Sequence, residues 1–187
     1  VVKKDPGSLK IGGTSSVWSM DHVQFLEVAR AAGVTGLDQI VYEGYENGGA
    51  VSSLMGGRID VLSAGASDVM GLMESGDLRV LAVTADKRLE NRLMAEIPTC
   101  MEEGIDVEFS NWRGLFGPAD MPDYALDYWE TTLREMAETE MWKDTCSRYG
   151  WKEDFQGHEE FEKFLDEMNE DYRELLEEVR GLEPAVP

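Results

Sequence analysis

Short apolar runs alternate with amphipathic stretches over the first 86 residues of the chain. The apolar runs predict strands at Leu9–Gly12, at Gln39–Tyr42, at Ile59–Ser63 and within SGDLRVLAVTAD at 75–86. The stretches between them predict helices at Ser19–Ala32, at Ala50–Met55 and at Ser67–Glu74. A strand followed by a helix, repeated several times, indicates parallel βαβ units joined by right-handed crossovers.

The pattern changes after residue 86. RLMAEIPTCMEEGI at 92–105 predicts a loop and a short helix, and VEFSNWRGLFGP at 107–118 predicts an extended segment without a crossover helix of its own. Hydrophobic residues then recur at helical spacing over 124–149, and again as a strong stripe over 158–180. The sequence therefore predicts an α/β fold followed by helices, with a change of organisation near Pro118.

The chain is strongly acidic, with 38 Asp and Glu residues against 17 Lys and Arg and a net charge of −21. Such a surface repels phosphate backbones, which argues against a nucleic-acid partner. Two interpretations stay open: a solvated surface suited to high salt, and an acidic docking surface for a basic partner. No apolar run approaches the roughly 18 residues that span a bilayer. VVKKDPGSLK at the start carries no signal peptide, so we expect the chain to begin inside a longer protein.

Three small polar loops follow the first three predicted strands. They are Gly12–Ser16, Gly44–Gly49 and Gly65–Asp68. Ligands of open α/β sheets bind beyond the carboxyl ends of the strands. Each loop also leads into a helix N-terminus, where unpaired N–H groups and the helix dipole favour an anion. One such loop is ordinary turn chemistry, whereas three at one edge indicate an anion-binding site.

Enzymatic chemistry has few candidate residues. Neither histidine, His22 or His158, has a Ser or Cys in a position typical of a nucleophile, and GGTSS lacks the Gly-x-Ser-x-Gly turn. We expect His22 at a helix start or on a cleft wall. Cys100 and Cys146 are too few for a metal site or a disulfide framework. We expect buried free thiols, although a single bridge between them stays open. No catalytic residue, metal or cofactor is assigned.

Arg113 within NWRG has two interpretations. A lone Arg between aromatic residues is often part of a structural ion pair, but its planar donors also match a carboxylate bidentately. Trp18 and Trp112 are similarly open between the hydrophobic core and the lining of a cleft.

Several motifs, in order, resemble a known family. They are DPGSLKIGGTSSVWSMDH, GGAVSSLMGGRIDVLSAG, ESGDLRVLAVTADKR, IPTCMEEGIDVEFSNWRGLFGPADM and FEKFL. Together they resemble the substrate-binding proteins of tripartite tricarboxylate transporters, of the TctC or Bug type, over nearly all of residues 5 to 182. GGTSSV and NWRG are most similar to the citrate-type branch.

The resemblance implies a two-lobed, periplasmic receptor that closes over a small di- or tricarboxylate, with a citrate-like ligand favoured, and delivers it to membrane transporter subunits. It implies no enzyme activity and no cofactor. The ligand-binding positions that it implies are Gly13, Thr14, Ser15, Ser16, Gly48, Gly49, Ala66, Ser67, Asp68 and Arg113. Two alternatives remain: an α/β enzyme acting on a small acidic substrate, and a sensory or interaction module.

The chain is shorter than the family pattern. The resemblance implies that residues 1–112 form the second, α/β lobe. Residues 113–187 then supply a crossover strand and the C-terminal helices, which pack on the first lobe, and the N-terminal part of that lobe is absent. The apolar stripe at 161–179, without the sheet that it normally covers, favours association with another copy or a complementing fragment, or marginal stability. Trp18 stands where relatives commonly carry a small residue, which implies a narrower or differently shaped pocket.

Overall fold

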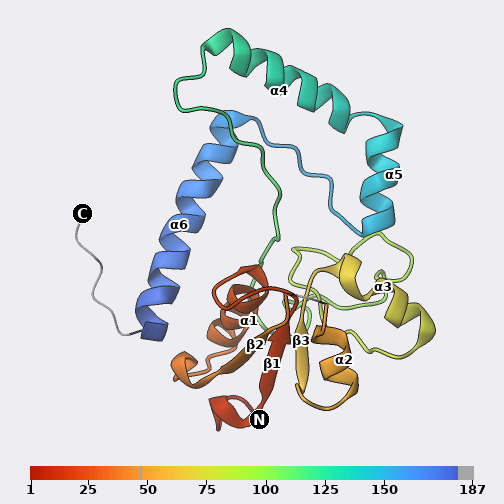
Figure 1. Cartoon of the computed structure of the whole chain (residues 1–187), viewed down its shortest axis with the longest axis vertical. Coiled ribbons are helices and arrows are strands. Elements are labelled where there is room, and N and C mark those ends of the chain that lie inside the picture. Colours follow the sequence, from red (N-terminus) through yellow and green to blue (C-terminus); the bar gives the residue numbers. More distant parts are fainter. Residues whose placement is uncertain (47, 181–187) are drawn as a thin grey trace.

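The structure is a computed structural model that describes residues 1–46 and 48–180. Its sheet contains three parallel strands, β1 (Lys10–Gly13), β2 (Val41–Gly44) and β3 (Val61–Ser63), in the order β2-β1-β3 (Figure 1). Because β1 lies in the middle, its Gly13 pairs with Gly44 on one side and with Ser63 on the other. The predicted parallel α/β class is confirmed.

Three helices connect and flank these strands: α1 (Met20–Ala31), α2 (Ala50–Met55) and α3 (Ala66–Ser75). The chain leaves α1 through Gly33, whose φ of 77° is in the left-handed region that glycine adopts without strain. The inner face of α1 buries Val23, Leu26 and Ala29 against Ile11 of the central strand. This packing fixes the start of α1 directly above the end of β1.

Two expectations for residues 75–105 are wrong. The fourth strand does not form beside the sheet, because Val83 bonds instead with the segment at 98–100, as an isolated bridge to Thr99. Leu81 beside it is 59% exposed. The short helix expected within 92–105 is replaced by turns. Pro98 lies in the middle of that stretch, and proline lacks the N–H of a helix interior and disfavours a helical residue before it.

The helical stretch at 124–149 divides into two helices, α4 (Asp123–Ala137) and α5 (Glu140–Tyr149). The break occurs at Thr139, which has extended backbone dihedrals and accepts a hydrogen bond from the N–H of Trp142 at 3.2 Å. This is the geometry of a helix N-cap. The third C-terminal helix is α6 (His158–Arg180), as the hydrophobic stripe predicts.

Helix α6 joins two parts of the molecule. Its last turns pack on the sheet unit, where Leu175 is 1% exposed and belongs to the same buried cluster as Ile11 and Leu26. Its first turns pack on the extended segment at 107–118, which we call the crossover. The ring centroids of Phe161 and Phe164 lie 5.3 and 6.1 Å from that of Trp112 in this segment. Of the two interpretations of Trp112, a core residue or part of a cleft wall, these contacts favour packing in the core.

Helices α4 and α5 stand away from the sheet and, with the crossover, form an arch over it (Figure 1). Large apolar side chains on the arch are exposed, although such side chains normally lie in a protein core. They are Leu115, Phe116, Tyr124, Tyr128, Trp129 and Met141. Within the described ranges no helix is both long and apolar enough to cross a membrane.

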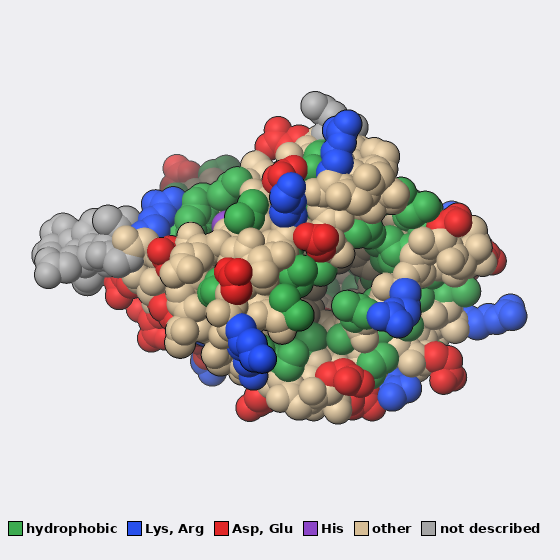
Figure 2. Space-filling view, turned by 90° about the horizontal axis from the view of Figure 1, so that it is seen from below, with side chains coloured by type: hydrophobic (Ala, Val, Ile, Leu, Met, Phe, Trp, Pro, Cys, Tyr) green, Lys and Arg blue, Asp and Glu red, His purple; other side chains and the backbone are tan. Residues whose placement is uncertain are grey.

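The acidic residues are not gathered on the face seen in Figure 2. On that face, hydrophobic side chains surround a central hollow, and carboxylates and basic groups are interspersed around it. This view therefore gives no single acidic docking surface. Cys100 and Cys146 are both buried free thiols, which confirms the first of the two interpretations.

Candidate functional site

The three predicted binding loops lie at one edge of the sheet. Since all three strands are parallel, their carboxyl ends meet there, with Gly13, Gly44 and Ser63 in register. The loops of residues 14–19, 45–49 and 64–65 lead from this edge into the N-termini of α1, α2 and α3. The topology thus brings together the backbone segments that the sequence analysis singled out.

The β1–α1 loop already holds a carboxylate of its own chain. Oδ2 of Asp21, in the first turn of α1, accepts hydrogen bonds from the N–H and the hydroxyl of Thr14 and from the hydroxyl of Ser15, each at 2.8 Å. Asp21 is only 4% exposed. The hydroxyl groups predicted to hold a ligand are therefore engaged by a buried internal anion.

The second side of this loop is held by Tyr42 of β2. Its hydroxyl donates to the carbonyl oxygen of Ser15 at 2.9 Å. The fit is close, because a Cβ atom added to Gly13 would lie 2.1 Å from the Tyr42 hydroxyl oxygen and 2.7 Å from Cβ of Asp21. A Cβ on Gly44 would lie 2.6 Å from the carbonyl oxygen of Ser15. Both glycines are required for the loop to lie this close to the sheet.

An aromatic stack lies beside the loop. The rings of His22 and Tyr42 have centroids 4.3 Å apart, and Trp18 lies 5.1 Å from His22 on the other side. Trp18 has a φ of 71°, an uncommon value for an aromatic residue, and its N–H donates to Nδ1 of His22 at 3.1 Å. The proton of neutral His22 is therefore on Nε2. Burial lowers the pKa of His22 to about 4, so this histidine is neutral at pH 7.

Three consecutive backbone donors of the loop have no partner among the described residues. They are the N–H groups of Ser15, Ser16 and Val17. The Ser16 side chain is exposed. The backbone carbonyl oxygen of Ser16 accepts a hydrogen bond from the N–H of Ser19 at 3.1 Å. These amides, rather than the hydroxyls of Thr14 and Ser15, are the donors that the loop offers to a bound molecule.

The β2–α2 loop supplies Gly48 and Gly49. Gly48 has a φ of 79°, and its N–H closes a turn onto the carbonyl oxygen of Tyr45 at 3.2 Å. Gly49 precedes the first turn of α2 and lies against the ring of Tyr45, since a Cβ placed on it would be 3.3 Å from that ring. The two glycines shape the turn and leave bare backbone at the sheet edge.

The β3–α3 loop places Ala66, Ser67 and Asp68 in the first turn of α3. The N–H of Asp68 bonds to the carbonyl oxygen of Gly65 at 3.1 Å, and the side chains of Ser67 and Asp68 are exposed. Helix α3 begins at Ala66, one residue before the predicted start, and Gly65 precedes it. The exposed Asp68 carboxylate adds negative charge to an edge proposed for anions.

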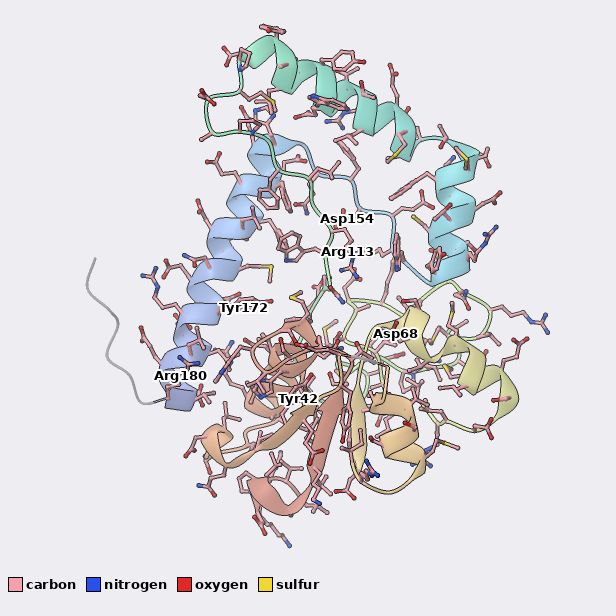
Figure 3. All side chains as sticks on the ribbon, viewed as in Figure 1. Tyr42, Asp68, Arg113, Asp154, Tyr172 and Arg180 are labelled. Atoms are coloured by element: carbon pink, nitrogen blue, oxygen red, sulfur yellow. The ribbon has the colours of Figure 1, made fainter. Side chains whose placement is uncertain are left out.

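Arg113 comes from the crossover and not from the sheet. Its Nη1 donates to Oδ1 of Asn111 at 2.5 Å, to the Asn111 carbonyl oxygen at 3.1 Å and to the Trp112 carbonyl oxygen at 3.0 Å. It forms no ion pair within the described residues. In the view of Figure 3 it lies above the sheet edge, on the side where Asp68 is labelled. The side chain is exposed, and its guanidinium is bound to the two residues before it, Asn111 and Trp112.

Asp21 and Tyr42 were not among the site residues predicted from the sequence. A signal for Asp21 is present in the sequence, since it is an acidic residue in the first turn of a predicted helix and follows several hydroxyl side chains. A carboxylate at such a position complements the free N–H groups at the helix start. No local signal identifies Tyr42, since its contact with Ser15 joins residues 27 positions apart. The structure gives Gly13 a packing role: its lack of a side chain lets Tyr42 and Asp21 approach the backbone.

A hollow of about 600 Å3 lies elsewhere, between α1, the segment at 106–110 and α6. Its walls include Glu27, Arg30, Phe109, Asp171 and Tyr172. Glu27 is bonded to Arg30 at 2.7 Å, and burial raises its pKa despite that partner. None of the predicted ligand-binding residues lines this hollow.

The fold and the loop edge define a periplasmic-binding-protein type of α/β unit. The chain matches the family described as "Tripartite tricarboxylate transporter family receptor" over residues 1–181 and belongs to that family. This is a family of transport receptors, which gives the enzyme alternative no support. A curated relative is the "UPF0065 protein in the TAR-I ttuE-ttuC' intergenic region" of Agrobacterium vitis. It is 29% identical over 125 residues, which cover 65% of this chain and 34% of that protein.

Two solved structures share the fold. One is described as a TctC solute binding protein from Polaromonas without ligand, with a TM-score of 0.70, 21% identity, and coverage of 90% of this chain and 56% of that one. The other, described as a periplasmic transporter, has a TM-score of 0.67 and 21% identity over 96% of this chain and 57% of its own. The chain thus spans little more than half the length of either structure.

Proposed function

We propose that this chain is the carboxylate-binding part of a periplasmic solute receptor that serves a tripartite tricarboxylate transporter. The observation that carries the proposal is the single sheet edge at which three βα loops meet, with N–H groups at Ser15, Ser16 and Val17 that have no partner among residues 1–46 and 48–180. Backbone donors near a helix N-terminus suit an anion. Membership of the receptor family supports a carboxylate as the class of ligand.

The ligand that we propose is a small di- or tricarboxylate, with a citrate-like acid favoured. A net charge of −21 repels such a ligand at long range, and added salt screens that repulsion. Recognition must therefore come from short-range donors. The proposed contacts are the N–H groups of Ser15, Ser16 and Val17, together with Gly48, Gly49, Ala66 and Ser67. Arg113 is the basic group above them once it leaves its bonds to Asn111.

The exposed arch supports the proposed division of the chain. We assign residues 1–112 to one lobe and residues 113–187 to the crossover and the helices that face another lobe, although the last turns of α6 pack on the first of these units. Exposed Tyr124, Tyr128 and Trp129 require a cover, since patches of this kind mark interaction sites. Until that lobe is present, we expect copies of the chain to associate through α4 and α5.

The experiment is thermal unfolding against citrate, succinate, malate, aspartate and aromatic acids, at low and high salt. A ligand at 100 times its dissociation constant stabilises a protein by about 2.7 kcal/mol. We expect a selective shift with one or two acids. If no acid shifts the unfolding temperature, the panel is repeated with a chain extended to the length of its structural relatives, and a second absence of shift contradicts the proposal.

A further inference from the structure

We propose that Asp21 is an internal carboxylate that positions the β1–α1 loop and thereby determines which donors the loop offers to a ligand. This inference deepens the proposed function and rests on it. It concerns a residue that is not among the predicted contacts and that does not touch the ligand. Asp21 acts through Thr14 and Ser15.

The geometry around Asp21 is that of a filled anion site. Three donors converge on one oxygen, Oδ2, at 2.8 Å each, and they come from two consecutive residues of the loop. Hydrogen bonds to an ionised acceptor are stronger than neutral ones, and a buried carboxylate requires them. Asp21 forms no ion pair with a basic side chain in the described part of the chain, so the loop donors are its compensation.

These bonds form part of a closed set that fixes the loop. The Ser15 hydroxyl donates to Asp21 and also accepts from the hydroxyl of Ser19, at 2.6 Å. The Ser15 carbonyl oxygen accepts from Tyr42. Ser15 is thus held by α1 through Asp21 and Ser19, and by β2 through Tyr42. Release of Asp21 removes the anchors of Thr14 and one of the anchors of Ser15.

A consequence follows for ligand recognition. A ligand carboxylate that used the same hydroxyls would stand beside the carboxylate of Asp21, and like charges at such a separation repel. The ligand must therefore use donors that Asp21 leaves free, which in this loop are the N–H groups of Ser15, Ser16 and Val17 and the exposed hydroxyl of Ser16. Asp21 thus directs a ligand to these donors and away from the hydroxyls of Thr14 and Ser15.

The test compares Asp21→Ala with Asp123→Asn. Asp123 is a matched control, because it also lies in the first turn of a helix, but its side chain is exposed and its helix, α4, stands away from the sheet edge. The first readout is amide hydrogen exchange without ligand. We expect the Thr14 amide to exchange about tenfold faster in Asp21→Ala, with Leu62 of β3 unchanged and Asp123→Asn like the native chain. An unchanged Thr14 rate overturns the proposal.

The second readout is citrate affinity by calorimetry. We expect Asp21→Ala to weaken citrate binding about tenfold and Asp123→Asn not to weaken it. Tighter citrate binding by Asp21→Ala overturns the proposal, because it shows that ligand and Asp21 compete for the same donors. If the native chain binds none of the acids, the proposed function fails, while the exchange readout still decides the positioning role.

A third variant covers a failure of Asp21→Ala to fold. Asp21→Asn keeps the size of the side chain and one accepting oxygen, but it loses the charge. We expect Thr14 exchange in Asp21→Asn to lie between those of the native chain and of a chain without the acceptor, with citrate affinity reduced in parallel. Native exchange together with native affinity in Asp21→Asn contradicts the role of the carboxylate.

Discussion

The guanidinium of Arg180 lies over the ring of Trp18, with its Cζ 4.5 Å from the ring centroid. Arg180 ends helix α6 (Figure 3), and Trp18 belongs to the β1–α1 loop, so the contact joins residues from opposite ends of the described chain. Trp18 in turn packs on His22, which packs on Tyr42. The last helix therefore supports the loop at the centre of the proposed site.

Replacement of Arg180 measures this support. Arg180→Gln keeps much of the side-chain stem but removes the charge, and we expect it to reduce the free energy of unfolding by about 0.5–1 kcal/mol, the range for exposed cation–π pairs. Arg180→Lys keeps the charge and should lose less. Urea unfolding of the three proteins checks this order. An equal loss in both variants would show that the charge over Trp18 is not what matters.

Gly13→Ala tests the close approach of the loop to the sheet. The added Cβ meets Tyr42 and Asp21 at once, and overpacking of this kind costs about 1–3 kcal/mol. For a chain of this size each kcal/mol lowers the melting temperature by about 2–4 °C. Gly71→Ala is the control, since a Cβ at that helical position meets nothing within 4 Å. It should stabilise α3 by about 1 kcal/mol. A tolerated Gly13→Ala contradicts the packing described here.

We expect the burial of His22 to make the free energy of unfolding sensitive to acid. Burial lowers its pKa to about 4, whereas in the unfolded chain it titrates near 6.5. The stabilisation is therefore fully present above pH 6.5 and falls as the pH drops toward 4, by at most about 3 kcal/mol. NMR titration of the His22 ring measures the pKa directly. The stability difference between native protein and His22→Asn should shrink over the same range, and a pKa near 6.5 would contradict burial.

Glu130 and His158 form a second pair with a different pH range. Oε2 of Glu130 accepts from the N–H of His158 at 3.0 Å and lies 2.5 Å from its Nδ1, and Arg134 donates to Oε1. The N–H and ring bonds of His158, followed by Arg134, lower the pKa of Glu130 to about 2. The Glu130 side chain raises the pKa of His158 above 6.5.

The two pKa shifts affect stability in opposite directions as the pH changes. The Glu130 contribution is present above its unfolded pKa near 4.5 and is lost as the pH falls toward 2, while the His158 contribution is lost as the pH rises through its raised pKa. Native protein should therefore exceed Glu130→Gln in melting temperature most clearly at pH 5.5, and less at pH 9. Glu135→Gln, an exposed carboxylate change on the same helix, serves as the control. A difference that grows from pH 5.5 to pH 9 would refute the pairing.

Local pattern was sufficient for most of the fold. The starts of α1 and α6 and the three parallel strands follow from hydrophobic periodicity and from glycine positions such as Gly33, because these elements are decided by nearby residues. The prediction of a fourth strand in the sheet was wrong because Val83 pairs with a different segment, near Thr99. Sequence pattern cannot weigh two partners that lie at different distances along the chain.

The candidate site was predicted only as far as its loops. The parallel topology brings them to one edge, as expected, but the use of the Thr14 and Ser15 donors by Asp21 depends on how tightly the loop folds over α1. That fold depends on Tyr42, a residue of another strand. Arg113 illustrates the same limit, since its bonds to Asn111 are set by the path of the crossover.

The most direct test of the proposed site is an amide NMR titration of the labelled chain with citrate. We expect the largest shift changes at Ser15, Ser16 and Val17, with further changes at Gly49 and Ala66 across the same sheet edge. The residues around the hollow near Glu27 and Asp171 should stay unchanged. Shift changes confined to that hollow, or spread over the arch and absent from Ser16, would contradict a carboxylate site at the strand ends.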